Sequence, residues 1–479
     1  MIPLILIALI SYFFIYCEWN FSFFYTLTIP IAAYFLLCFI LMHFFHIEVA
    51  TVNDIIQILC ESTKSPSRIV VGVIYEERLD EKDFVAKLKI SAFAHPYYEK
   101  LKKKLCVFKY ILLFGYWKKF ESFNINQHIE IIDSNLNSLE ALYSNIADKL
   151  SCQFPEDRPP WKMDIYPNFL GKKSACIFQI HHAYIDGISA FTYFLNLTEC
   201  KNYSFITLPK ISKWQWVYVL IVGIVKIFKT YFHFITWKRD EKPFHNGSIS
   251  GKKILYANEV CALESIKKFT RQHGVTINDT MMAVLCYTLK QYCKKIYTED
   301  IGDVLVMIPT SIRPMPKPEE HYPLTNYTVA IHAKFPMNFD KNILNTIKAY
   351  NKILLDAKKS YDIYYLKMAL EFMPFFLFPS IIRKIILYIC NKVSFVFTNV
   401  PGPCAPLISF GKYRVENIIS SLNLFSDNAL AFSLVSYNGK MTLTCIADRE
   451  IKFDVKDFVE LYQEMLGRTI KGETELLSF

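Results

Sequence analysis

Two adjacent histidines followed by an aspartate are the residues of this chain best suited to act together in a reaction. His181 and His182 end an apolar, β-prone stretch that begins at Ser174, and Asp186 and Gly187 follow shortly after. Neighbouring side chains on a strand point to opposite faces, so the two histidines cannot do the same job. An imidazole at the rigid end of a strand titrates near neutral pH and suits general-base catalysis. We therefore predict that one histidine faces a cleft as a base, while the other packs or hydrogen-bonds inside the protein.

The segment that follows the histidines has its own expected geometry. Asp186 and Gly187 predict a tight turn, and Gly187 tolerates a positive φ if the turn needs one. The alternative interpretation is a pair of satisfied core histidines followed by an ordinary turn aspartate, which a lone histidine would favour. Two imidazoles and a carboxylate within so short a stretch favour a functional site instead.

The chain as a whole is apolar and basic. Its 479 residues suffice for two domains with a sizeable core. Hydrophobic residues make up 52% and aromatic residues 16%, which exceeds most soluble enzymes and indicates membrane contact. A formal net charge of +10 favours anionic partners, either a lipid headgroup surface or a phosphate-bearing cofactor. No nucleic-acid partner is expected, because no basic run is interleaved with aromatic residues in a recognisable binding module.

The cysteines indicate neither a disulfide framework nor a metal site. There are 13 of them, an odd number, and they are scattered without any Cys-x-x-Cys or any Cys/His cluster at metal-binding spacing. We expect free thiols in a reducing compartment and no metal.

The N-terminus is predicted to contact a membrane. Residues 2–16 form one apolar run, residues 17–20 interrupt it, and residues 21–45 form a second run long enough to span a bilayer. We expect residues 1–46 to be a membrane anchor, either a hairpin or one span with a re-entrant segment. A cleaved secretory signal fits poorly, because no basic region precedes the first run. The basic, thiol-rich remainder favours a catalytic body that faces the cytosol, with the membrane that of the endoplasmic reticulum.

The globular part divides at a polar stretch. Residues 239–252 contain Pro243, Asn246-Gly247 and Gly251, so we predict a linker there between domains at 47–238 and 253–479. Strands are expected at 69–75, 253–257, 304–308, 431–436 and 441–447, and helices at 81–90, 263–273, 280–292 and 455–466. Two further apolar stretches, 214–237 and 364–390, are equally consistent with a lipid-facing surface and with core packing; prolines break the second.

A second group of candidate residues lies in the C-terminal half. Thr276 and Asp279 have the spacing of a capping box at a helix start, which gives Asp279 a structural role. Asn278 lies between them without such a role, and its amide could point from the helix start into an active cleft.

Several motifs resemble one enzyme family. His181-His182-x-x-x-Asp186-Gly187 resembles the HHxxxDG motif of acyl-CoA-dependent acyltransferases with the chloramphenicol-acetyltransferase-like fold. Asn278-Asp279, the Arg313-Pro314 strand end and the sequence from Asn399 through Pro401 and Gly402 to Pro403 then occur in the order typical of the wax ester synthase/diacylglycerol acyltransferase family. His128 and the segment 157–161 also fit family motifs, which we interpret as packing and turn residues. Leu324-Thr325-Asn326 lacks a glycine that relatives often carry, which puts a tight backbone approach there in doubt.

The resemblance implies a fold and a reaction. The expected fold is α/β, with two domains, mixed sheets and flanking helices. The expected reaction moves a fatty acyl group from acyl-CoA, a co-substrate, to a long-chain alcohol or diacylglycerol, without a permanently bound cofactor. His182 is the implied general base; His181, Asp186 and Asn278 complete the catalytic set. Asp186 is expected to pair with Arg313 rather than with His182, and the supporting residues are Gly187, Arg313, Asp279, Asn399, Pro401 and Gly402.

Three competing interpretations are weaker. His181 and Asp186 also satisfy the H-x4-D pattern of glycerophosphate acyltransferases, but no matching phosphate-binding glycine motif follows. Peptide condensation domains share HHxxxDG but rarely begin with a membrane segment. A membrane-anchored lipid-binding protein with an inactive site would be expected to have lost His182 or Asn278, and both are present. No Gly-x-Ser-x-Gly sequence indicates a covalent acyl-enzyme.

Overall fold

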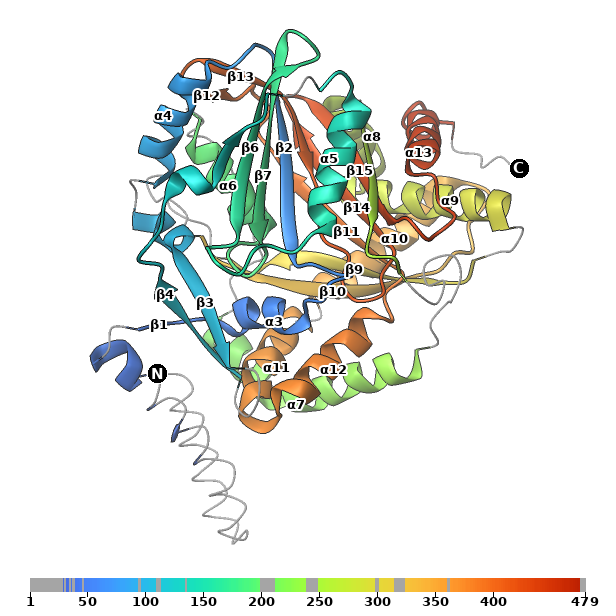
Figure 1. Cartoon of the computed structure of the whole chain (residues 1–479). Coiled ribbons are helices and arrows are strands. Elements are labelled where there is room, and N and C mark those ends of the chain that lie inside the picture. The colour runs from blue at the N-terminus through green and yellow to red at the C-terminus, as the bar shows by residue number, and fades with distance from the viewer. Residues whose placement is uncertain are drawn as a thin grey trace, which may run out of the picture.

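The computed structural model describes most of the chain beyond residue 46. The described residues are 47–93, 96–108, 113–133, 136–198, 212–237, 249–297, 301–313, 324–359 and 362–473, with 29, 32–33, 36 and 39–44 nearer the N-terminus. Within them, the strands form two six-stranded sheets and one three-stranded sheet. Figure 1 shows the two large sheets next to each other with helices packed around them. This is the α/β architecture with mixed sheets that the sequence predicts.

The first large sheet carries the histidines at the end of a central strand. Its order is β12-β13-β2-β7-β6-β5, in which β2 is Arg68–Tyr75, β7 is Lys173–His181, β6 is Trp161–Phe169 and β5 is Ile129–Ile131. β2 and β7 are antiparallel, and His181 lies opposite Arg68. Every residue of β2 is buried, as its uninterrupted apolar sequence predicts for a strand covered on both faces.

The second large sheet has the order β10-β9-β11-β14-β15-β8. The strands are β10 Thr328–Phe335, β9 Val304–Ser311, β11 Phe395–Pro401, β14 Leu430–Tyr437, β15 Lys440–Asp448 and β8 Lys253–Ala262. β11 runs parallel to both of its neighbours, whereas the other pairs are antiparallel. Asn438 and Gly439 join β14 to β15, both with positive φ, as a two-residue hairpin turn requires.

Two strands of the C-terminal half belong to the sheet of the N-terminal half. β12 (Ile408–Ser409) and β13 (Tyr413–Ser420) leave the second sheet, and β13 pairs antiparallel with β2. The sequence analysis did not foresee this crossing, because a strand's hydrophobic pattern does not name its partner. Residues 239–248 of the predicted linker lie outside the described residues, so the boundary there stays a prediction.

The helices cover the sheets and fill the space between them. They are α3 (Val52–Cys60), α4 (Glu81–Phe93), α5 (Leu139–Ser151), α6 (Gly187–Asn196), α7 (Lys213–Thr236), α8 (Leu263–His273), α9 (Ile277–Tyr297), α10 (Ile343–Lys359), α11 (Asp362–Phe376), α12 (Pro379–Cys390) and α13 (Val455–Ile470). α5 lies between the two sheets. Its Tyr143 hydroxyl donates to the Ala257 carbonyl of β8 at 2.7 Å, and its Ile146 packs on Gly72 of β2. The remaining small sheet joins β1 (Glu48–Val49), β4 (Phe114–Lys119) and β3 (Lys103–Phe108).

The prolines divide the apolar stretch 364–390 as predicted. α11 has Pro374 in its last turn, and α12 begins at Pro379, the first-turn position that proline favours. In Figure 1, α3, α7, α11 and α12 gather at one end of the molecule, below β9 and β10. The strand end that carries the histidines faces the same end, since α3 leads directly into β2.

Most of the predicted membrane anchor at 1–46 lies outside the described residues. Among the residues that are described, no helix combines the length and apolarity that a bilayer crossing requires. The ten cysteines in the described segments are all free. The same segments contain no cluster of three or more potential metal-ligating side chains.

Candidate active site at the end of β7

His181 is committed to the protein through both of its ring nitrogens. Nδ1 accepts the backbone N–H of Ala183 at 3.0 Å, so Nε2 carries the proton and donates to Glu61 Oε2 at 3.2 Å. Burial is the largest influence on the pKa of Glu61 and would raise it, but the hydrogen bonds from His181 and from the Ser67 N–H, together with the nearby Arg68 guanidinium, lower that pKa overall. We predicted that His181 belongs to the catalytic set, but in the structure both of its ring nitrogens contact protein groups. Its ring has no nitrogen left for a substrate, and it acts as a brace for the turn.

His182 is fixed by its backbone, while its ring remains available. Its N–H donates to the Ser67 carbonyl at 2.9 Å, and its carbonyl accepts from Asn326 Nδ2 at 3.1 Å. The ring lies 6.3 Å from that of Phe425, centroid to centroid. Nδ1 is buried and makes no hydrogen bond of good geometry, which leaves Nε2 as the nitrogen that can meet a substrate.

The protonation state of His182 suits a base. Burial lowers the pKa of this imidazole, because the charged form is poorly solvated there. The nearby backbone carbonyl of His182 itself and the charge of Asp186 oppose that effect without reversing it. The ring is accordingly neutral at pH 7, the form that can accept a proton.

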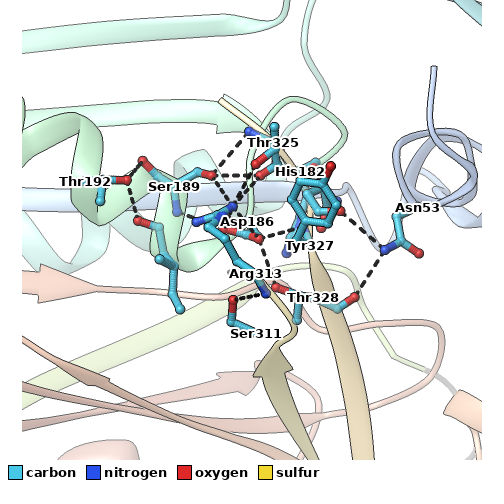
Figure 2. A network of polar contacts seen from close by, with 12 residues as sticks. Asn53, His182, Asp186, Ser189, Thr192, Ser311, Arg313, Thr325, Tyr327 and Thr328 are labelled. Atoms are coloured by element: carbon cyan, nitrogen blue, oxygen red, sulfur yellow. Dashed lines mark hydrogen bonds and ion pairs between the residues drawn. The ribbon is translucent and has the colours of Figure 1, made fainter. Parts of the chain in front are cut away.

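Asp186 is buried and fully occupied by structural partners. It caps α6 by accepting the Ser189 N–H at 2.8 Å, and it pairs with Arg313 Nη2 at 3.1 Å. The Tyr327 N–H (2.8 Å) and the Thr328 hydroxyl (3.1 Å) also donate to it. Figure 2 shows Arg313, Tyr327 and Thr328 gathered around this carboxylate, with His182 beside them. The predicted pairing of Asp186 with Arg313 is thus present, and the carboxylate makes no hydrogen bond to His182.

The segment that lacks the family glycine still approaches closely. The Asp186 N–H donates to the Thr325 carbonyl at 3.2 Å, and Ser189 Oγ donates to the same carbonyl at 2.7 Å. The Thr325 hydroxyl accepts from Arg313 at 2.9 Å. Threonine is tolerated because its side chain joins the polar network instead of colliding with it.

Gly187 does not have the role expected of it. It is the first residue of α6, and its φ is not among the positive values of the described residues. A Cβ at this position would meet nothing within 4 Å. Because Asp186 is an extended N-cap with φ −95° and ψ 176°, the helix starts without any left-handed turn. The glycine provides neither a positive φ nor close packing, and open space lies beside it.

Asn278 and Asn399 join the start of α9 to β11. Asn399 Nδ2 donates to Asn278 Oδ1 at 2.6 Å, so the Asn278 amide has its N–H groups left to donate elsewhere. The predicted capping box is confirmed: Thr276 N–H donates to Asp279 Oδ2 at 2.7 Å, and Asp279 N–H donates to Thr276 Oγ1 at 3.3 Å. Asn278 is thereby held at the helix start by its neighbours in sequence.

β11 ends where its backbone touches β14. Pro401 lies opposite Ser436 in the parallel ladder. The Gly402 N–H donates to Ser436 Oγ at 3.0 Å, and a Cβ on Gly402 would lie 2.1 Å from the Ser436 carbonyl oxygen. Only glycine fits this contact, which is the physical reason for the support role predicted for Gly402.

Three supporting residues of the site were given no role from the sequence, although Asn326 stands in the segment 324–326 that was compared with the family. Glu61 braces His181, Asn326 holds the carbonyl of His182, and Asn53 of α3 donates to the Asn326 and Thr328 carbonyls, both at 3.3 Å. They are ordinary polar residues far from the motif in sequence. Only a contact pattern between distant segments would have identified them.

His128 is a packing residue, as interpreted from the sequence. It is buried and stacked on Trp161 with centroids 4.3 Å apart, and its Nδ1 lies 2.9 Å from the Trp161 carbonyl. A cavity of about 340 Å³ nearby is lined in part by Phe154, Arg158 and Lys162. None of the predicted site residues lines it.

Two family descriptions match the chain, one in each half. The wax ester synthase/diacylglycerol acyltransferase catalytic domain matches residues 81–202, which include both histidines and Asp186. The WS/DGAT C-terminal domain matches residues 324–469, which include Asn399 and the crossing strands. The two matches together cover more than half of the chain. The chain belongs to the wax ester synthase/diacylglycerol acyltransferase family. It is accordingly an acyl-CoA-dependent O-acyltransferase.

Relatives of the family are distant in sequence and similar in fold. The O-acyltransferase WSD of Acinetobacter baylyi is 21% identical over 366 residues, which cover 70% of this chain and 78% of that protein. The wax ester synthase/diacylglycerol acyltransferase of Marinobacter aquaeolei is similar with a TM-score of 0.59 at 18% identity, covering 87% of this chain and 98% of that one. A trichothecene 15-O-acetyltransferase from Fusarium sporotrichioides has a TM-score of 0.62 at 11% identity, covering 87% of this chain and 93% of that one. At these low identities, the structural similarity shows a shared fold.

Proposed function

We propose that this acyltransferase esterifies a lipophilic alcohol with a fatty acyl group from acyl-CoA, and that His182 is the general base. The observation that carries the proposal is the contrast at the end of β7. His181 and Asp186 have their polar atoms taken by protein partners, whereas His182 has a fixed backbone, a lowered pKa and no hydrogen bond to its buried Nδ1.

The reaction follows from a neutral imidazole whose Nε2 can meet the acceptor. Nε2 takes the proton of the alcohol hydroxyl while the alcohol oxygen attacks the thioester carbonyl carbon. The carbon–sulfur bond then breaks, and the proton passes from His182 to the thiolate of coenzyme A. The products are an ester and a free thiol, and no covalent acyl-enzyme is needed.

Asn278 is the proposed donor to the developing oxyanion or to the substrate. Its Oδ1 already accepts from Asn399, so its amide N–H groups are the atoms free to donate. A positioned amide donor stabilises the charge that appears on the carbonyl oxygen during acyl transfer.

The acceptor and the setting follow from the family and from composition. A long-chain alcohol would give a wax ester, and diacylglycerol would give triacylglycerol. The apolar N-terminal sequence supports a membrane-bound enzyme, with its catalytic body on the cytosolic face of the endoplasmic reticulum.

The test supplies both acceptors at once. Membranes containing the protein are incubated with isotope-labelled acyl-CoA, hexadecanol and diacylglycerol, and the neutral lipids are separated. Label in wax ester or triacylglycerol supports the proposal and ranks the acceptors. Acyl-CoA that is bound but unchanged would instead identify a lipid-binding protein and overturn it. His273→Ala, at the exposed end of α8, is a matched histidine control that should retain full activity.

A further inference from the structure

One face of α7 is apolar and exposed along its length. Large apolar side chains that are between 43 and 83% exposed recur at helical spacing: Trp214, Val217, Tyr218, Ile221, Val225, Phe232 and Ile235, which we call the α7 stripe. Residues three and four apart share one face of a helix. Exposed apolar residues scattered singly need no explanation, but a continuous stripe of this kind marks a surface that is covered by something.

The opposite face of the same helix packs on α11 at the side chains that the structure describes. Val219 is buried, and Trp216 packs edge-on against Tyr364 of α11 with centroids 5.7 Å apart. Gly223 touches Met368 and Tyr365 so closely that a Cβ would lie 2.5 Å from the Met368 Cε. The contacts to α11 therefore determine which side of α7 faces outward, and the α7 stripe lies on that side.

The composition of α7 identifies a lipid surface as the occupant. Its 24 residues include lysines at 213, 226 and 229 but no aspartate or glutamate. An interfacial helix combines an apolar face with lysine or arginine and aromatic residues, and it is attracted to anionic lipid headgroups. The net charge of +10 on the whole chain has the same sign. A protein-binding helix would more typically carry charges of both signs around its apolar face.

The position of the stripe relative to the site fits a lipid supply. α7 packs on α11, and both lie with α3 and α12 at the end of the molecule toward which the histidine strand points (Figure 1). Arg383 of α12 donates to the Leu59 carbonyl of α3 at 2.9 Å. Asn53 of α3 in turn bonds to the Asn326 carbonyl, and Asn326 holds the carbonyl of His182. The docking helix and the proposed base thus belong to one connected end of the fold.

We propose that the α7 stripe docks this enzyme on the surface of an anionic lipid bilayer, with α7 lying in the plane of the interface. Phe378, which precedes α12, and Ile381 and Tyr388 of α12 are also exposed apolar residues, and α12 lies at the same end of the molecule as α7 (Figure 1). This contact is separate from any anchor formed by residues 1–46. It does not depend on acyl transfer, so each can fail without the other.

Two tryptophans on one helix provide the test. The full chain is bound to vesicles of phosphatidylcholine and phosphatidylglycerol, with and without bromine on the acyl chains, and bromine quenching of tryptophan emission is measured. Trp214→Phe should remove a large part of the quenchable emission, because Trp214 lies on the stripe. The matched control Trp216→Phe should leave the quenchable part unchanged, because Trp216 faces α11. Emission from other tryptophans, including Trp19 between the two apolar N-terminal runs, is common to all three proteins.

The outcomes of this experiment distinguish a lipid bilayer from a second copy of the chain as the surface that covers the α7 stripe. Omitting phosphatidylglycerol should weaken the quenching of Trp214, as the basic side chains require. If Trp214→Phe leaves the quenched fraction unchanged, the stripe does not meet lipid and the proposal is wrong. If Trp214 emission instead shifts with protein concentration in the absence of vesicles and is not quenched by bromine, the stripe is a contact between copies of the chain. That outcome also overturns the proposal. No acyl-CoA enters the measurement, so its result is independent of the catalytic assay.

Discussion

Asp186 and His182 lie close in sequence, but they are held in opposite ways. The carboxylate of Asp186 receives hydrogen bonds from two backbone N–H groups, a hydroxyl and a guanidinium. The ring of His182 lies tilted near that of Phe425 and has a buried nitrogen without a hydrogen bond. A group whose every lone pair is taken maintains the fold, while one that is fixed by its backbone alone remains free to react. The comparison therefore supports the proposal that His182 is the base, while Asp186 has a structural role.

The largest expected effect on the reaction comes from removing the imidazole of His182. His182→Ala should lower kcat by about 10²- to 10⁴-fold, the contribution typical of a positioned general base. The thermal unfolding midpoint should stay close to that of the wild type, because the ring makes no hydrogen bond that holds the fold. Kinetics and calorimetry on the same purified preparation check both statements. If the thermal unfolding midpoint of His182→Ala were well below that of the wild type, His182 would be mainly structural, like His181.

Substitutions at Asp186 and Arg313 should lower the stability of the protein rather than act on the reaction itself. Asp186→Ala leaves Arg313 buried without its partner, and breaking a buried ion pair by removing one member costs about 3–5 kcal/mol. Arg313→Ala should cost a similar amount, and the double variant should cost less than the sum of the two. Denaturant unfolding of the three variants measures this coupling. Additive losses would show that the pair does not act as a unit.

A smaller effect is expected at Asn278, the proposed oxyanion donor. Asn278→Ala should lower kcat by about 10²-fold, as the loss of one oxyanion donor does, with little change in KM. Asn399→Ala removes only the bond that orients the Asn278 amide, so its effect on kcat should be weaker and in the same direction. Steady-state kinetics of both variants measures the ratio. A KM effect without a kcat effect would place Asn278 in substrate binding instead.

The sequence predicted more of the fold than of the site. Buried strands such as β2 and capped helices such as α9 carry their pattern locally, so their positions were predictable from the residues themselves. The crossing of β13 onto β2 was not, because pairing between distant strands leaves no local mark. The tight turn predicted at Asp186 and Gly187 is instead a helix start without a positive φ. Asp-Gly fits a turn as well as it fits an N-cap, and the helix that follows decides between them.

Within the site, the motif predicted the pairing of Asp186 with Arg313 but not the residues that support the two histidines. The identities of His182, Asp186 and Arg313 follow from residue type and motif order. Glu61 and Asn326 became visible only where α3 and the start of β10 meet the end of β7. The different environments of His181 and His182 could likewise be seen only in the folded structure. The alternation of a strand predicts that one of them faces inward, but it does not say which one.

The pH dependence of the acyl-transfer step tests the central claim most directly. The pKa of His182 is lowered by burial, and the proposed mechanism requires the neutral ring. The single-turnover rate should therefore be constant near pH 7 and fall as pH drops through a pKa below the usual histidine value of about 6.5. His182→Gln cannot be protonated in this range, so its residual rate should show no such acidic limb. A limb with the same pKa in His182→Gln would contradict the assignment of His182 as the base.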